Sequence, residues 1–244
     1  MRKIIAYPLS VFYFICFGLL LVLFHPIQWI CLKFGGYNAH KQSVDMLNLC
    51  LTKCLLLLGT SIHFDCKVKL PKGVPLVIVA NHQSMYDIPP IIWYMRNFHA
   101  KFISKQELGK GIPSVSFNLR HGGSVLIDRK DPKQAVPAIS NFAKFIAHNS
   151  YSAVIFPEGT RSRNGVPKPF QTTGLKILFK ELKDGYVVPI SINNSWKTHC
   201  YGSFPMGIGN RIEFKVHQAL PIREYHVEEL ITLVEATVKK DIKV

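Results

Sequence analysis

The stretch Asn81-His82-Gln83-Ser84-Met85-Tyr86-Asp87 decides how this chain folds, because it joins two elements of different character. Residues 74–80 before it form a short apolar run rich in Val and Ile, which predicts a buried strand. Residues 88–96 after it carry two prolines near their start, where a helix tolerates proline in its first turn. The sequence therefore predicts a strand, a turn and a helix, with Asp87 as the N-cap of the helix.

His82 and Asp87 form a candidate catalytic pair in this turn. A spacing of five residues does not place two side chains on one face of a continuous helix. The two side chains meet only if the chain folds back within the turn, and the carboxylate can then accept a hydrogen bond from one imidazole nitrogen. The other nitrogen is left to accept a proton, as in an oriented general base. The same residues are also compatible with an Asp that only caps a helix and an incidental His in a loop.

Composition narrows the class of partner. The chain has 244 residues, which suits one domain or one domain with a small appendage. Its 30 Lys and Arg residues against 15 Asp and Glu residues give a formal charge of +15, which favours nucleic acid, an acidic membrane surface or a phosphorylated substrate. A positive mean hydropathy favours the membrane. Aromatic residues beside basic ones in a nucleic-acid-binding module are not apparent, so we expect no nucleic-acid partner.

Cysteine usage indicates a reducing compartment. The six cysteines include no Cys-x-x-Cys pair, and four of them lie in apolar N-terminal segments. They are best interpreted as small buried hydrophobic residues, without a disulfide framework or a zinc site. We expect no metal and no cofactor.

The N-terminal part of the chain is strongly apolar. Residues 4–30 follow Arg2 and Lys3, and the run is longer than the core of a signal peptide and lacks a cleavage site. It is long enough to cross a bilayer, which needs about 20 apolar residues, or it could lie in one leaflet. After a loop at 34–38, residues 41–58 repeat apolar side chains every three or four positions, which predicts an amphipathic helix ended by Gly59. This second helix could contact the membrane or pack in the core.

Strands and helices alternate from residue 61 onward. This pattern predicts an α/β fold with a mixed, largely parallel sheet flanked by helices. Residues 1–60 are accordingly predicted to be a membrane-associating segment of two helices, and residues 61–244 the α/β domain. The expected strands are 63–70, 74–80, 101–104, 124–127, 152–156, 187–192 and 211–217, and the expected helices are 88–98, 133–148, 174–182 and 225–242.

Three predicted strands are followed directly by residues suited to catalysis or to anion binding. Residues 74–80 lead into His82, residues 124–127 into Arg129, and residues 152–156 into a turn that contains Gly159 and Arg161. Ligands of open α/β sheets bind beyond the carboxyl ends of the strands, so these groups are expected to converge on one cleft. Arg161 could hold a phosphate through two parallel hydrogen bonds, although a single arginine in a loop is usually a solvated charge.

Four segments resemble the motifs of the glycerolipid acyltransferases. They are Asn81-His82-x4-Asp87, then Gly123-Ser124-Val125-Leu126-Ile127-Asp128-Arg129, then Phe156-Pro157-Glu158-Gly159-Thr160-Arg161-Ser162, and finally Val187-Val188-Pro189-Ile190. They occur in the order found in the family and cover roughly residues 60–195. The segment Gln171-Thr172-Thr173-Gly174 departs from the family pattern, since many members carry Lys or Arg before this glycine.

The resemblance implies transfer of an acyl group from a thioester of coenzyme A or acyl carrier protein to the hydroxyl of a lysophosphatidate. His82 would be the general base and Asp87 would orient it. Arg129, Arg161 and Lys105 would hold the acceptor phosphate. The residues expected to contact substrates are Lys105, Arg129, Glu158, Gly159, Thr160 and Arg161. Because acceptor and product stay in the bilayer, we expect attachment to the cytoplasmic face of the cell membrane.

Other functions remain compatible with the same residues. The acceptor could be glycerol 3-phosphate or another lysophospholipid. A His–Asp pair could also serve hydrolysis or phosphodiester chemistry, which predicts turnover of the thioester without an acceptor. A basic lipid-binding protein without catalytic activity would tolerate the loss of His82.

Overall fold

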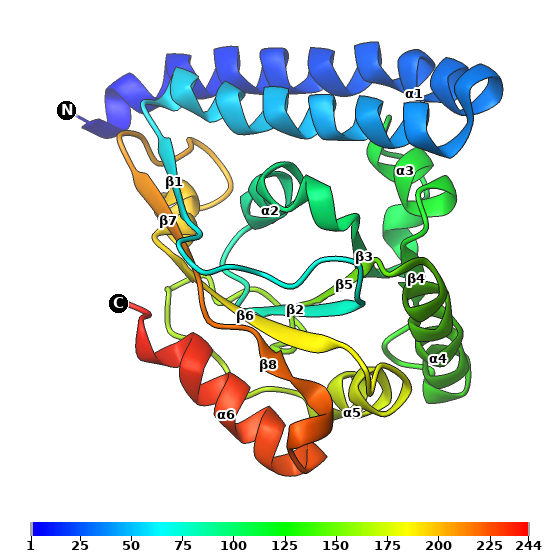
Figure 1. Cartoon of the computed structure of the whole chain (residues 1–244). Helices are drawn as coiled ribbons and strands as arrows, with labels where there is room; N and C mark the ends of the chain where they lie inside the picture. Colours follow the sequence, from blue (N-terminus) through cyan, green and yellow to red (C-terminus); the bar gives the residue numbers. More distant parts are fainter. Residues whose placement is uncertain (1, 244) are drawn as a thin grey trace.

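The computed structural model describes residues 2–243 and contains an eight-stranded sheet covered by helices on both faces (Figure 1). The strand order is β1-β7-β6-β2-β5-β3-β4, with β8 paired to β6. Strands β6, β2, β5, β3 and β4 are mutually parallel, whereas β7 is antiparallel to β6. The predicted mixed, largely parallel sheet is therefore confirmed. The strands are β1 (Ser61–Asp65), β2 (Leu76–Ala80), β3 (Ala100–Lys105), β4 (Val125–Ile127), β5 (Ser152–Ile155), β6 (Tyr186–Asn193), β7 (Arg211–Val216) and β8 (Leu220–Pro221).

Two hydrophobic cores lie on the two faces of the sheet. Successive side chains of a strand point to opposite faces, so Ile78 packs in the core beneath α1 and α2, while Val77 and Val79 pack in the core beneath α4, α5 and α6. This two-sided burial explains why residues 74–80 are apolar without alternation. The helices are α1 (Arg2–Cys54), α2 (Ile88–Tyr94), α3 (Val115–His121), α4 (Pro132–Asn149), α5 (Thr172–Glu181) and α6 (Val227–Lys240).

The helix α1 is a hairpin of two antiparallel helices that lies across one side of the molecule (Figure 1). The expected loop at 34–38 is reduced to a reversal at Gly36, whose φ of 66° suits glycine. The second helix buries Val44 and Leu51 in the cores, so it packs against the rest of the protein. The first helix, in contrast, exposes large apolar side chains along most of its length: Ile4, Ile5, Tyr7, Val11, Phe12, Phe14, Ile15, Leu19, Val22, Leu23, Ile27, Trp29, Ile30 and Phe34.

Several elements differ from the sequence prediction. The first strand ends at Asp65 instead of residue 70, because its register on β7 covers only residues 61–65. Residues 88–98 form a shorter helix that ends at Tyr94 and continues as a 3₁₀ turn. The helix α3 was not predicted, because seven residues are too few to show a helical period. Tertiary contacts help to fix its start, where Ser114 Oγ donates to the carbonyl of Leu21 at 2.6 Å and the N–H of Ser114 donates to His25 Nδ1 at 3.1 Å.

Candidate active site

The turn after β2 is held by hydrogen bonds from its own backbone. Ser84 caps a 3₁₀ turn of residues 85–87, and Asp87 is the reciprocal member of this capping box. Asp87 Oδ2 accepts from the N–H of Gln83 at 2.7 Å and of Ser84 at 2.9 Å. Asp87 occupies the predicted N-cap position of α2, with the prolines just inside the helix, but its side chain makes no capping hydrogen bond to α2 and points back into the turn.

The same turn brings His82 and Asp87 together. His82 Nδ1 lies 2.9 Å from Asp87 Oδ2. The carboxylate is fully buried, whereas the imidazole side chain is 16% exposed. An ionised carboxylate can only accept hydrogen bonds, so Nδ1 carries the proton and Nε2 is the acceptor of the neutral imidazole. The ring also stacks on Phe156, with centroids 4.2 Å apart and planes 18° apart. The imidazole is thus fixed in tautomer and in orientation.

The turn after β5 lies directly beside the turn after β2, because the two strands are parallel neighbours. The N–H of His82 donates to Glu158 Oε1 at 2.8 Å, and the N–H of Lys168 donates to Oε2 at 2.9 Å. Glu158 is only 2% exposed, and burial raises the pKa of its carboxyl group. In return, the N–H of Ser162 donates to the carbonyl of His82 at 2.7 Å. Oε1 of Glu158 therefore joins the two turns, and Oε2 ties the segment after β5 to itself through the backbone of Lys168.

The other predicted site residues lie at the same edge of the sheet. Arg129, at the end of β4, donates from Nη1 to the carbonyl of Gly159, which has a φ of 71°. Thr160 is exposed and Arg161 is half-buried in the turn after β5. Lys105 is exposed at the end of β3, and within residues 2–243 its side chain forms no hydrogen bond or ion pair. The structure thus gathers all eight candidates at the carboxyl ends of β2, β3, β4 and β5.

A histidine that the sequence did not single out borders this edge. His199 stacks on Tyr86 with centroids 5.7 Å apart, and its Nδ1 lies 2.9 Å from Thr198 Oγ1. Burial lowers the pKa of His199, and the nearby charges of Arg161 and Arg163 lower it further. Residues 196–244 contain no recognisable motif, so only the fold reveals that this ring approaches the His82 turn.

An apolar cavity of about 210 Å³ lies beneath the hairpin, between α1, α2 and α3. Met85 and Tyr86 of the His82 turn line it, together with Phe102 on β3 and Val44 on α1. Its walls are almost entirely hydrophobic, so it suits a hydrocarbon chain.

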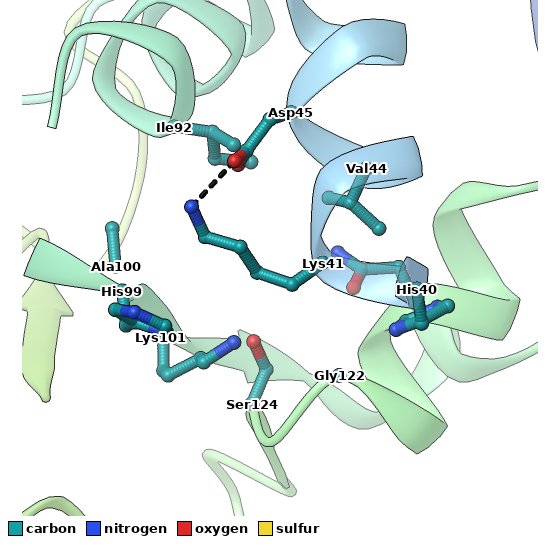
Figure 2. A pocket seen from close by; sticks show the side chains of 11 residues that line it. His40, Lys41, Val44, Asp45, Ile92, His99, Ala100, Lys101, Gly122 and Ser124 are labelled. Carbon is teal, nitrogen blue, oxygen red and sulfur yellow. Dashed lines mark hydrogen bonds and ion pairs between the residues drawn. The ribbon is translucent and has the colours of Figure 1, made fainter. Parts of the chain in front are cut away.

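A small polar pocket lies at the opposite edge of the sheet, where β3 begins (Figure 2). Its volume is about 20 Å³, and the ion pair between Lys41 and Asp45 spans it at 2.5 Å. Lys101 extends into it with 6% exposure, and burial lowers the pKa of its ammonium group to about 8. This pocket is remote from His82, because β2 and β3 run in the same direction and His82 follows the far end of β2.

The fold and the site together define an α/β protein with an oriented His–Asp pair at the carboxyl edge of a mostly parallel sheet. The chain belongs to the acyltransferase family, since the family model "Acyltransferase" matches residues 61–193, more than half of its length.

Named relatives support this assignment. The chain is 26% identical over 208 residues to the 1-acyl-sn-glycerol-3-phosphate acyltransferase of Borreliella burgdorferi, covering 83% of this chain and 80% of the relative. It is 24% identical over 159 residues to the human 1-acyl-sn-glycerol-3-phosphate acyltransferase alpha, covering 65% of this chain and 55% of the relative. The chain spans about half the length of the curated animal relatives it matches.

The fold is also that of a solved structure. The crystal structure of the 1-acyl-sn-glycerophosphate acyltransferase PlsC from Thermotoga maritima matches with a TM-score of 0.79, covering 98% of this chain and 95% of that chain. The sequence identity is 24%, so this likeness describes the fold alone.

Proposed function

We propose that this protein transfers a fatty acyl group from an acyl thioester to the sn-2 hydroxyl of 1-acyl-sn-glycerol 3-phosphate and so makes phosphatidic acid for phospholipid synthesis. The observation that carries this proposal is the 2.9 Å contact between His82 Nδ1 and Asp87 Oδ2, which leaves Nε2 as a base at the carboxyl edge of the sheet. The relatives from Borreliella burgdorferi and human carry the name of this activity.

The chemistry follows from the orientation of His82. A hydroxyl is a weak nucleophile, so Nε2 takes its proton while the oxygen attacks the thioester carbonyl carbon. Asp87 stabilises the imidazolium that forms. The tetrahedral intermediate then collapses, the C–S bond breaks, and the imidazolium returns the proton to the departing thiolate. The products are an ester and a free thiol, and the acceptor hydroxyl takes the place of a catalytic serine.

The acceptor phosphate would be held by cations beside this base. Arg161 and His199 lie close enough for the charge of Arg161 to lower the pKa of His199. Arg129 and Lys105 are additional cations at the same edge and would hold the phosphate with Arg161. The backbone N–H groups near Gly159 would stabilise the oxyanion, since the turn after β5 faces the His82 turn.

The acyl chain of the donor would occupy the apolar cavity beneath the hairpin. The cavity begins at Tyr86, four residues after His82, and extends along α1. Burying a methylene group contributes about 0.8 kcal/mol, so a long acyl chain gains substantially from such a site.

The first helix of α1 would attach the protein to the cytoplasmic face of a membrane. This helix is long and apolar enough to cross a bilayer, and only 22% of its most apolar window is buried. Its large exposed apolar side chains would otherwise face water. Lys33 and the N-terminal Arg2 and Lys3 would contact anionic headgroups, each contributing about 1 kcal/mol near the surface.

A donor–acceptor matrix tests the proposal. The purified protein in anionic phospholipid vesicles would be given palmitoyl-coenzyme A or palmitoyl carrier protein with lysophosphatidate, glycerol 3-phosphate or a phosphate-free lysolipid. We expect phosphatidic acid from lysophosphatidate with at least one donor. Preferred acylation of glycerol 3-phosphate, thioester hydrolysis that needs no acceptor, or the absence of any turnover would contradict it.

A further inference from the structure

A second cleft reaches the site from the other face of the sheet. Its volume is about 220 Å³, and it opens between the starts of α4 and α5. Ile139 and Ile155 line it, and both belong to the core on the face opposite α1. The apolar cavity lies on the α1 side, where Val44 and Phe102 belong to the other core. The two cavities therefore lie on opposite sides of the sheet.

Both cavities reach residues that adjoin His82. Phe156 lines the second cleft, while its ring packs against the core on the α1 side and stacks on the His82 imidazole at a centroid distance of 4.2 Å. On the other side, Met85 and Tyr86 of the His82 turn line the apolar cavity. A long ligand with its reactive group at His82 could therefore extend one end into each cavity.

The lining of the second cleft is mixed in polarity. It includes the apolar Val136 and the polar Gln171 and Thr173, and the latter two belong to the segment that departs from the family pattern. Lys130 and Lys133 are exposed and lie in the sequence on either side of Pro132, which lines the cleft. Within residues 2–243 neither lysine forms an ion pair. Such a lining suits a narrow ligand that alternates amide and hydrocarbon groups and ends in a phosphate.

Arg129 and Gly159, assigned above to the acceptor phosphate and to the oxyanion, also line the cleft, so the two substrates meet there and differ in the side from which they approach. The exposed apolar helix of α1, which we expect to contact the membrane, covers the other face of the sheet (Figure 1). A cleft between α4 and α5 consequently opens on the side away from that helix. The acceptor keeps its acyl chain in the bilayer, whereas the carrier portion of the donor arrives from water. The cleft is therefore on the side from which the donor must approach.

We propose that this cleft binds the 4′-phosphopantetheine arm of the acyl donor, the group shared by coenzyme A and acyl carrier protein. The sulfur end of the arm lies beside Phe156, the acyl chain passes His82 into the apolar cavity, and the phosphate lies toward Lys130 and Lys133. This assignment rests on the proposed acyl transfer and adds the location of the soluble part of the donor.

Filling the cleft tests the assignment. Ala135 lines it from α4, so Ala135→Trp should block the arm. The matched control is Ala147→Trp, an exposed position in the last turn of the same helix that does not line the cleft. The donors are palmitoyl-coenzyme A, palmitoyl carrier protein and palmitoyl-N-acetylcysteamine, which lacks the phosphate and most of the arm. We expect Ala135→Trp to raise KM at least tenfold for both full donors, and to leave KM unchanged for the truncated donor and for lysophosphatidate.

Direct binding separates this inference from the proposed reaction. Calorimetric titration with coenzyme A requires no turnover, and binding should be lost in Ala135→Trp and kept in Ala147→Trp. Val136→Trp, at a 41% exposed position in the same lining, repeats the test if Ala135→Trp does not fold. Unchanged coenzyme A binding in a folded cleft variant, or an equal rise in KM for the truncated donor, would overturn the assignment. A wild-type protein that binds coenzyme A but makes no phosphatidic acid would contradict only the proposed function.

Discussion

Replacing Asp87 by Asn would remove one charge and little else from the site. Asp87 Oδ2 accepts from His82 Nδ1 and from the N–H groups of Gln83 and Ser84, and the amide oxygen of Asn can accept the same three hydrogen bonds. The amide nitrogen would then occupy the place of Oδ1, which is buried without a hydrogen-bond partner within residues 2–243. Because a buried unsatisfied donor costs roughly 1–3 kcal/mol, we expect a loss of unfolding free energy of that size.

The effect on catalysis comes from the missing charge beside the imidazolium. Two unit charges about 4 Å apart interact by roughly 4 kcal/mol at an effective dielectric constant of 20. Since each 1.4 kcal/mol or so changes a rate tenfold, kcat should fall about 10³-fold. The assay is phosphatidic acid formation from palmitoyl thioester and lysophosphatidate in vesicles.

A control must separate this effect from the loss of any buried carboxylate. Asp45→Asn provides it, because Asp45 is also buried but pairs with Lys41 at the opposite edge of the sheet (Figure 2). Its kcat should stay within about threefold of wild type. A folded Asp87→Asn variant with kcat within tenfold of wild type would refute the assigned role of the carboxylate.

Three further changes test other parts of the structure. Arg161→Ala removes a cation beside the site and should raise KM for lysophosphatidate roughly 10- to 100-fold, the value of a bidentate charge-assisted contact; an equal effect on a phosphate-free acceptor would contradict this role. Burial lowers the pKa of Lys101 from 10.5 to about 8, so the unfolded chain binds more protons and wild-type stability rises with pH between these values. Denaturant titrations should therefore show Lys101→Met more stable than wild type by up to about 3 kcal/mol at pH 7, with a difference that shrinks toward pH 10.5; a pH-independent difference would contradict the cause. Replacing Leu19 and Val22, which are 55% and 57% exposed, with Glu should release the folded protein from vesicles in a flotation assay. Retained vesicle binding by this double variant would contradict attachment through this face.

Local patterns predicted much of the fold. The five residues of β2 are all buried, which is why an apolar run without alternation predicted a central strand. The rule that ligands bind beyond the carboxyl ends of parallel strands correctly grouped His82, Arg129 and Arg161 at one edge. These features depend on residues close together in the sequence and on the common direction of neighbouring strands.

Features that depend on distant partners could not be predicted in the same way. The antiparallel direction of β7 is set by its pairing with β6, and no local pattern specifies that direction. His199 approaches the His82 turn only because Thr198, beside it, lies 3.2 Å from Ser84, more than a hundred residues earlier. A single histidine in a segment without a motif carries no signal of such a contact.

The position of Asp87 at the start of α2 was predicted, but its capping box with Ser84 was missed although the sequence held a clue. Ser84 precedes an acidic residue by three positions, which is the spacing of a capping box. The two prolines of α2 drew attention to the helix that follows, yet the box closes one turn earlier. Recognising it would have explained how His82 and Asp87 meet at a spacing unsuitable for a continuous helix.

The most direct test of the central claim is the rate of phosphatidic acid formation by His82→Ala. Purified wild type and variant would receive the same palmitoyl thioester and lysophosphatidate in vesicles, with folding checked by circular dichroism and acceptor binding measured separately. We predict that kcat falls about 10²- to 10⁴-fold, the usual contribution of a general base, while binding of lysophosphatidate is retained. A folded His82→Ala protein that forms phosphatidic acid at close to the wild-type rate would contradict the account.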